Sequence, residues 1–341
     1  MLRLPSQIAP LALSACLLAA VLLIGCRHGR HGAQEFAYVS AAQVILRDHL
    51  AAVYEKSGVA KNGERVEILE RERRFARVRT SSGAEGWVEQ RNLVTQDIFD
   101  QFQKLALDEQ KSPVQAAGIT HNESNLHLDP GRDTDHLYQL NEGSKVSLLR
   151  RASTEKTTSN ASAKPGASKS AKVAAVPLED WWLVRDSQQH VGWILSRMVD
   201  LDVPIEIAQY AEGQRMVASF VLNQVNDGDK NISQYLVLFT QPKDGIPFDF
   251  DQVRVFTWNV RRHRYETAYR ERKLNGVLPV TVSRENFDKE GTLPVFVVHV
   301  KDDTGNITER KYKLNTPIVR RVLPPGEQKD LPKQRTRGNH A

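Results

Sequence analysis

Three histidines and four carboxylates that lie close together in the sequence are the residues best suited by type to hold a metal ion. The group consists of His121, His127, His136, Glu123, Asp129, Asp133 and Asp135. Imidazole nitrogens and carboxylate oxygens are ordinary zinc ligands, but a zinc site needs them in a fixed, near-tetrahedral arrangement. These residues fall in a predicted loop, where no regular element would fix their geometry. We therefore expect a solvated loop, with no bound metal and no cofactor.

Residues for hydrolytic chemistry do not occur in any recognisable pattern. The sequence contains neither Gly-x-Ser-x-Gly nor His-Glu-x-x-His, and its two cysteines are Cys16 and Cys26. We expect a protein that is not an enzyme and that has no small-molecule substrate. The alternative is a hydrolase without a known motif, which would release muropeptides from the cell wall.

The N-terminal residues have the layout of a secretory signal. A basic start at Arg3 precedes an apolar segment over 11–24. The residues that close this segment, Leu23-Ile24-Gly25-Cys26, resemble the lipobox of bacterial lipoproteins. That resemblance implies a signal peptide over 1–25, a diacylglycerol on the thiol of Cys26, and a tether over 26–36.

Lipidation of Cys26 would make the protein a membrane-anchored lipoprotein of the cell envelope that faces the periplasm or the exterior. Several acyl chains hold a protein on a bilayer almost permanently, at about 0.8 kcal/mol per buried methylene. Lipidation would also leave no cysteine nucleophile, which excludes a cysteine peptidase. The alternative is an uncleaved anchor, because Arg27 and Arg30 follow the apolar segment and positive charge tends to stay on the cytoplasmic side.

The charge of the chain indicates the kind of partner it can have. Its 341 residues carry a formal net charge of +6, which favours anionic surfaces such as lipid head groups or cell-wall polymers. The basic residues are spread along the chain, and an exported protein does not meet nucleic acid. We therefore expect no nucleic-acid partner.

Two segments, 37–95 and 118–203, repeat one order of strand and turn signals. Each has a turn glycine, an alternating strand, a strand that starts with an aromatic residue, and a strand that opens with Gly-Trp. These markers are Gly63, Phe75 and Gly86-Trp87 in the first segment, and Gly143, Trp182 and Gly192-Trp193 in the second. The second segment also contains an insertion at 152–177, whose composition cannot form a core, so we expect it to be disordered.

These segments resemble bacterial Src-homology-3 domains, in which an early strand, a turn, an aromatic strand and a Gly-Trp-Val strand follow one another. The second segment fits this pattern better, with Asn125-Leu126-His127-Leu128 as the early strand and Trp181-Trp182 as the aromatic pair. The resemblance implies small barrels that bind peptides, often those of peptidoglycan.

Aromatic side chains between the loops of such a barrel could stack on an extended peptide, and neighbouring charged groups could bind its ends. The candidate ligand-binding residues are Arg47, Asp48 and Tyr54 in the first segment, and Asp129, Tyr138 and Trp181 in the second. Other aromatic residues occupy predicted core-strand positions, and we expect them to pack in the barrel interiors. They are Phe75, Trp87, Trp182 and Trp193.

The rest of the chain contains a linker, a third β-rich unit and a tail. The linker, 96–117, has a predicted helix over 97–110 with one apolar face. Residues 205–322 show short alternating strands separated by turn signals, which predict an antiparallel sandwich or barrel. The Pro-, Lys- and Arg-rich tail at 323–341 is expected to be disordered.

A basic segment is the most prominent feature of the third unit. It contains Arg261, Arg262, His263, Arg264, Arg270 and Arg272. These residues could meet an anionic polymer or lipid, although alternating charge on the solvent face of a strand is a commoner reason for such a pattern.

The sequence thus predicts an all-β chain with two small barrels, joined by a short helix and followed by an antiparallel β domain. We expect a non-catalytic envelope lipoprotein that binds peptidoglycan or an envelope protein through its tandem barrels. In the alternative, the third unit docks an envelope protein complex and the barrels do not touch the wall.

Overall fold

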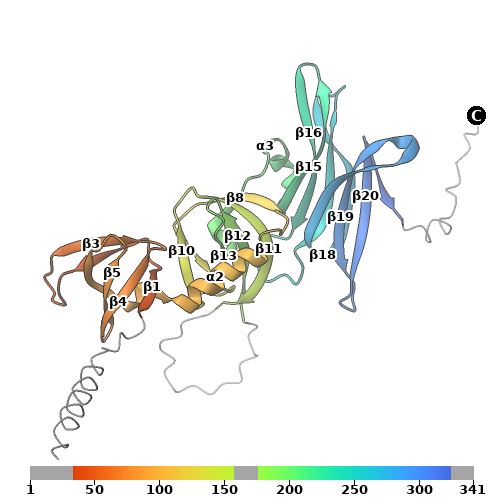
Figure 1. Ribbon diagram of the computed structural model, residues 1–341. Coiled ribbons are helices and arrows are strands. Elements are labelled where there is room, and N and C mark those ends of the chain that lie inside the picture. The colour runs from red at the N-terminus through yellow and green to blue at the C-terminus, as the bar shows by residue number, and fades with distance from the viewer. Residues whose placement is uncertain (1–33, 157–175, 324–341) are drawn as a thin grey trace, which may run out of the picture.

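The computed structural model describes residues 34–156 and 176–323, which form three antiparallel sheets arranged in a row (Figure 1). The fold is nearly all β, as the sequence predicts, and its longest described helix is α2 (Gln96–Asp108). The predicted signal peptide, Cys26, most of the insertion and the C-terminal tail lie outside the described residues. Among the residues that are described, no helix is long and apolar enough to cross a membrane.

The first sheet curls into a small barrel, which we name barrel 1. Its strands are β1 (Glu35–Val39), β2 (Gln43–Arg47), β3 (Lys56–Lys61), β4 (Arg65–Glu72), β5 (Phe75–Thr80), β6 (Glu85–Glu89) and β7 (Leu93–Thr95). They pair in the order β3-β2-β6-β5-β4-β1-β7. Side chains alternate between the two faces of a strand, so Ala76 and Val78 are fully buried while Arg77 and Arg79 between and after them are exposed.

The second sheet, barrel 2, repeats this topology. Its strands are β8 (Ala116–Thr120), β9 (Ser124–His127), β10 (His136–Leu140), β11 (Lys145–Glu155), β12 (Leu178–Asp186), β13 (Val191–Leu195) and β14 (Val199–Leu201). They pair in the order β10-β9-β13-β12-β11-β8-β14, so each strand takes the place of the barrel 1 strand seven earlier. The repeat in the sequence is therefore a repeat in strand order.

Strand pairing corrects one detail of the sequence comparison. In both barrels a valine of the aromatic strand pairs with the glycine of Gly-Trp. Counted from that pair, Phe75 corresponds to Trp181, whereas the repeat had placed it opposite Trp182. A shift of one residue moves a side chain to the other face of a sheet. Trp182 accordingly packs in the main core, and Trp181 packs in a separate cluster with Leu183 and Trp193.

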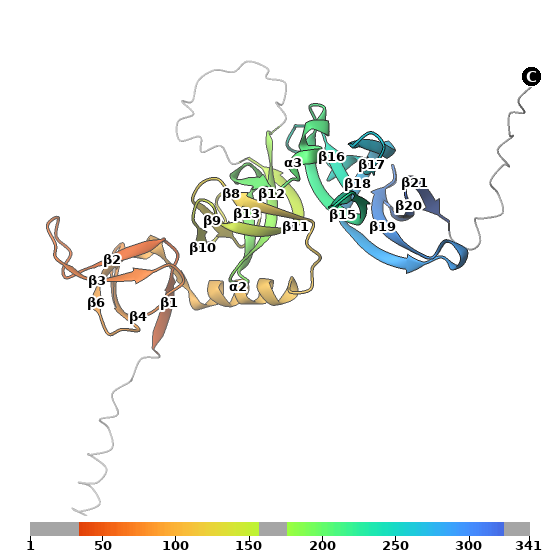
Figure 2. The same cartoon turned by 90° about the horizontal axis from the view of Figure 1, so that it is seen from above.

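Helix α2 leaves barrel 1 and runs along the side of barrel 2 (Figure 2). Its apolar face contacts both barrels. Phe99 stacks on Tyr38 of barrel 1 with the ring centroids 3.8 Å apart, while Leu105 and Ala106 pack against the outer cluster of barrel 2. Phe102, between these contacts, is buried. The helix therefore fixes the two barrels against each other, as its apolar stripe predicts.

The third unit is one continuous sheet in which the strands pair in chain order. Its strands are β15 (Arg215–Asp227), β16 (Lys230–Thr240), β17 (Phe250–Asn259), β18 (Arg264–Asn286), β19 (Thr292–Lys301), β20 (Ile307–Asn315) and β21 (Ile318–Val322). The first part of β18 pairs with β17 and its last part with β19. The sheet folds along this strand, and side chains from both halves share one core. It therefore packs as a sandwich although it is a single sheet.

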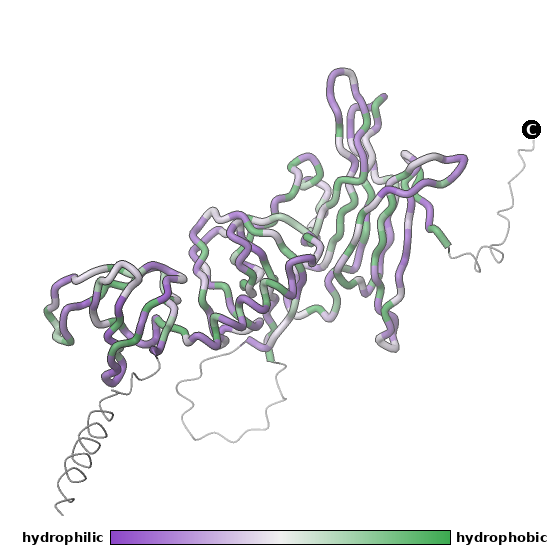
Figure 3. The backbone as a smooth tube through the Cα atoms, in the orientation of Figure 1, coloured by the Kyte–Doolittle hydropathy of each residue, from purple (hydrophilic) through white to green (hydrophobic). Residues whose placement is uncertain are grey.

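Short helices connect the regular strands. They are η1 (Gln90–Asn92), η2 (Ser196–Met198), α3 (Ile205–Ala208), η3 (Gln209–Ala211) and η4 (Asp288–Glu290). Figure 3 shows hydrophobic residues along the strands and hydrophilic residues at hairpin tips such as that between β15 and β16.

A single asparagine joins the turn after β3 of barrel 1 to β10 of barrel 2. The Nδ2 group of Asn62 donates to the carbonyl oxygen of Leu137 at 2.7 Å, and the backbone N–H of Gln139 donates to Asn62 Oδ1 at 3.1 Å. The same Nδ2 lies within 3.3 Å of the carbonyl oxygens of Val39, Ser40 and Ala41. Asn62 thus closes its own turn and holds the neighbouring barrel.

Candidate functional site

An outer face of barrel 1 brings cationic and aromatic side chains together. Strand register places Trp87 on β6 between Arg47 on β2 and Arg77 on β5. The Arg47 guanidinium lies 4.3 Å from the ring centroid of Tyr54 and 5.6 Å from that of Phe75. Tyr54, Phe75, Trp87 and Arg47 are half-buried, so parts of their surfaces are open to solvent. We name Arg47, Tyr54, Phe75, Arg77 and Trp87 together the aromatic face.

Hydrogen bonds to Asp48 position the loop that carries Tyr54. Asp48 Oδ1 accepts from the backbone N–H groups of His49 at 2.9 Å and Glu55 at 2.8 Å, and His49 Nδ1 lies 2.7 Å away. Desolvation acts in the opposite sense, but these contacts hold the pKa of Asp48 below its ordinary value. Asp48 therefore shapes the loop, and the half-buried Arg47 and Tyr54 side chains lie at its two ends.

The aromatic face has more cations than its carboxylates neutralise. Arg74 lies 5.2 Å from the Phe75 ring, and neither Arg74 nor Arg47 forms an ion pair within the described part of the chain. Arg77, in contrast, pairs with Glu85 at 3.1 Å. Two unpaired guanidinium groups beside half-buried aromatic rings can bind a carboxylate bidentately while the rings contact an extended peptide.

The corresponding face of barrel 2 is closed. His127 pairs with Trp193 as Arg47 pairs with Trp87, and Trp181 takes the place of Phe75. Trp181 is 2% exposed and Trp193 is 7% exposed, because α2 lies on this cluster. A ligand cannot stack on a buried ring, so the interpretation of Trp181 as a ligand-binding residue is corrected: it packs beneath the helix.

Tyr138 and Asp129, the other two candidates in barrel 2, do not join a common site either. Tyr138 is 7% exposed and stacks on His190 with the centroids 3.7 Å apart, while Gln103 donates to its hydroxyl at 3.0 Å. Burial raises the pKa of Tyr138, which keeps this hydroxyl protonated. Asp129 is exposed in the loop before β10. Tyr138 is a structural residue at the junction of α2 and the barrels.

The histidine and carboxylate group at 121–136 does not converge on one point. Within the described ranges no three His, Cys, Asp or Glu side chains are placed to hold a metal ion. The His127 and His136 rings are 5.6 Å apart. Burial lowers the pKa of both imidazoles, and the charge of His136 lowers that of His127 further.

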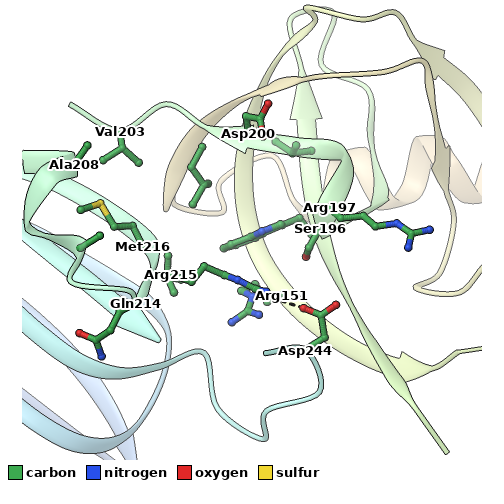
Figure 4. A pocket seen from close by; sticks show the side chains of 15 residues that line it. Arg151, Ser196, Arg197, Asp200, Val203, Ala208, Gln214, Arg215, Met216 and Asp244 are labelled. Carbon is green, nitrogen blue, oxygen red and sulfur yellow. Dashed lines mark hydrogen bonds and ion pairs between the residues drawn. The ribbon is translucent and has the colours of Figure 1, made fainter. Parts of the chain in front are cut away.

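A cavity of about 430 Å³ is lined by residues of barrel 2 and of the third unit (Figure 4). Two of its arginines already have carboxylate partners: Arg151 pairs with Asp180 at 2.5 Å, and Arg215 pairs with Asp244 at 2.9 Å. These arginines also join the two units, since Arg151 donates to the carbonyl oxygen of Asp249 at 2.9 Å and Arg215 lies 3.6 Å from Asp180.

Phe75 and Trp87 belong to the aromatic face although their strand positions suggested core residues. Trp182 and Trp193 are buried, as expected, whereas Phe75 and Trp87 are only half-buried. The sequence does hold a signal for this difference. Phe75 alternates in phase with the exposed Arg77 and Arg79, and these arginines mark the outer face of β5.

Residues 44–94 match the family described as bacterial SH3 domain, and this range contains every residue of the aromatic face. A search of curated proteins gave no match. Among solved structures, NlpC2 from Trichomonas vaginalis is 13% identical with a TM-score of 0.17, over 50% of this chain and 49% of that one. An NlpC/P60 family protein from Bacillus cereus is 9% identical with a TM-score of 0.24, over 49% and 56%. The chain thus spans about half the length of these proteins, and TM-scores this low carry no conclusion.

Proposed function

We propose that this chain is a non-catalytic protein of the bacterial cell envelope that binds a peptide through the aromatic face of barrel 1. The observation that carries the proposal is the Arg47 guanidinium, which lies 4.3 Å over Tyr54 without a carboxylate partner. The contrast between the barrels supports it. The same face is open in barrel 1 and covered by α2 in barrel 2, so one barrel serves binding and the other serves assembly.

The chemistry of the face suits a peptide that ends in a carboxylate, as peptidoglycan stem peptides do. Stacking on Tyr54, Phe75 and Trp87 would hold the extended backbone with little sequence preference. Arg47 and Arg74 would donate to the carboxylate, and charge-assisted bonds of this kind are about twice as strong as neutral ones. Lipidation at Cys26 would hold barrel 1 at the membrane surface, close to the cell wall or to an envelope protein.

Retention of the full chain on purified sacculi tests this function. The double variant R47Q/R74Q should reduce retention about tenfold, because it removes Arg47 of the aromatic face and Arg74 beside Phe75, two cations without an ion pair among the described residues. The matched control is R65Q/R91Q, which removes two other barrel 1 arginines: Arg65 stacks on Phe36 at 3.6 Å, and Arg91 pairs with Glu89. Equal retention of the two variants and the parent protein would sink the proposal.

The mass of the protein purified from its native membrane tests the anchor separately. A mass that corresponds to residues 26–341 plus acyl chains supports lipidation at Cys26. An unprocessed mass replaces the lipoprotein with a membrane-anchored protein, and it leaves the peptide-binding proposal unchanged.

A scaffold that docks an envelope protein complex is the second candidate. It is favoured by the core that runs without a break from barrel 2 into the third unit, since such a rigid platform suits docking. Crosslinking in cells should then give one discrete protein adduct that the R47Q/R74Q variant retains. An adduct that this variant loses would assign the contact to barrel 1 instead.

A further inference from the structure

Arg254, on the central strand β17 of the third unit, is a buried cation. Only 1% of its side chain is exposed. Nη1 donates to the carbonyl oxygen of Tyr210 at 2.8 Å, and Nη2 donates to Glu212 Oε2 at 2.9 Å and to Gln214 Oε1 at 3.0 Å. The Nε–H group is shielded from solvent and has no hydrogen-bond partner among the residues that the structure describes. Burying a guanidinium group with an unpaired N–H donor raises the free energy of the folded state.

Further arginines crowd around this group. Arg270 lies directly opposite Arg254 in the ladder between β17 and β18, and like charges in such positions repel. Glu212 is the single carboxylate that both arginines share, at 2.9 Å and 3.3 Å. Arg272 donates only to the neutral Oε1 of Gln252, at 2.9 Å. Burial lowers the pKa of Arg254, and the charges of Arg270 and Arg272 lower it further.

The backbone of β18 brings one more cation to the same place. Lys273 has a φ of +59°, a left-handed conformation that non-glycine residues rarely adopt. In a regular strand Arg272 and Lys273 would point to opposite faces. Here both line one cavity of about 520 Å³, together with Arg254, Glu212 and Asp251. The irregular backbone thus concentrates positive charge that a regular strand would separate.

We propose that this cavity binds a phosphate group, and we name it the Arg254 cavity. Guanidinium groups match the geometry of phosphate oxygens, and a lysine adds a flexible point charge. Three cations line the cavity, Arg254, Arg272 and Lys273, against the two carboxylates of Glu212 and Asp251, and Arg270 lies opposite Arg254 in the ladder, so an anion relieves their mutual repulsion. The phosphate can belong to a lipid head group or to a soluble or polymeric phosphate ester. This site is independent of the aromatic face.

The basic segment 261–272 is therefore not one patch. At its N-terminal end, Arg262 and Arg264 both approach Glu266, at 3.2 Å and 3.5 Å. At its C-terminal end, Arg272 lines the Arg254 cavity, and Arg270 shares Glu212 with Arg254. This division supplies a matched control, because R262Q/R264Q and R272Q/K273Q each remove two positive charges from exposed positions, the former at the start of β18 and in the turn before it, the latter within β18.

Isothermal titration calorimetry of the full chain tests the proposal with three probes: inorganic phosphate, glycerol 3-phosphate and dihexanoyl phosphatidylglycerol. R272Q/K273Q should weaken binding of the best probe at least tenfold, while R262Q/R264Q leaves it unchanged. Tighter binding of the lipid assigns the site to a head group, and tighter binding of glycerol 3-phosphate assigns it to a soluble or polymeric ester. Both variants replace exposed side chains, and an unchanged unfolding midpoint confirms that they fold. Equal losses in the two variants, or no binding of any probe by the parent protein, would overturn the proposal.

Discussion

Arg151 on β11 and Asp180 on β12 form an ion pair of 2.5 Å in which the side chains are 8% and 0% exposed. The pair also joins barrel 2 to the third unit. Asp180 Oδ1 accepts from the backbone N–H of Gly245 at 3.0 Å, and Arg151 Nη1 donates to the carbonyl oxygen of Asp249 at 2.9 Å. A short segment of the third unit is thus held by both members of a buried pair.

The variant D180N should be strongly destabilised, because it leaves the guanidinium of Arg151 buried without its counter-charge. Breaking a buried ion pair by removing one partner costs about 3–5 kcal/mol. Urea unfolding measures this loss. R262Q is the control, since Arg262 and Glu266 are 63% and 37% exposed and surface pairs contribute at most about 1 kcal/mol. Similar losses in the two variants would show that the interface does not depend on this pair.

The variant N62A should loosen barrel 1 from barrel 2 without unfolding either. It removes the acceptor of the Gln139 amide and the donor to Leu137, and each lost hydrogen bond costs about 1 kcal/mol. Hydrogen exchange should therefore become faster at the Gln139 amide. N122A, at an exposed position of barrel 2, should leave that rate unchanged. A protected Gln139 amide in N62A would contradict this role.

Protonation of the Glu271 carboxylate should make the third unit less stable at low pH. Burial alone raises its pKa, but the hydroxyls of Tyr312 and Tyr269 and the charge of Arg310 outweigh burial and hold the pKa below 4.5. A depressed carboxyl pKa stabilises the folded state above the unfolded value, and this stabilisation is lost as pH falls through the folded value. The unfolding free energy of the parent protein should therefore drop more between pH 7 and pH 3 than that of E271Q. Parallel pH profiles would refute the linkage.

Asp48 should affect ligand binding only through the position of Tyr54. D48A removes the acceptor of two backbone N–H groups, and we expect retention on sacculi to fall several-fold. D48N keeps an oxygen at Oδ1 and should restore most of the retention. If D48N were as weak as D48A, the charge of Asp48 would contact the ligand directly, and its structural role would be wrong.

The fold was predictable because its signals are local. Gly-Trp strands, turn glycines and period-two alternation lie within short segments, and the family match at 44–94 contains one complete set of them. Arg47 and Tyr54 are likewise close in sequence, and one loop brings them together. For the candidate ligand-binding residues of barrel 2, local signals could not show which side chains are covered in the fold. Trp181 is covered by α2 and Tyr138 by His190, and both contacts join distant parts of the chain.

Arg254 is a residue that sequence reasoning overlooked, because the cations around it come from a different strand. In the sequence it stands alone between two valines, outside the basic segment 261–272. Only the register of β17 against β18, together with the left-handed residue at Lys273, assembles the cations of the Arg254 cavity.

The hairpin of β11 and β12 has a practical consequence for work on this protein. Its ladder continues to the pair Glu155 and Leu178, so the first residues of the predicted insertion, 152–155, belong to β11, and the chain at 155 and at 178 is held in place whatever sequence joins these two points. The entropy of closing a loop grows only with the logarithm of its length. An affinity tag or a fluorescent label can therefore be engineered between these two strands, where it gives a handle for isolating complexes and leaves the aromatic face and the Arg254 cavity unaltered.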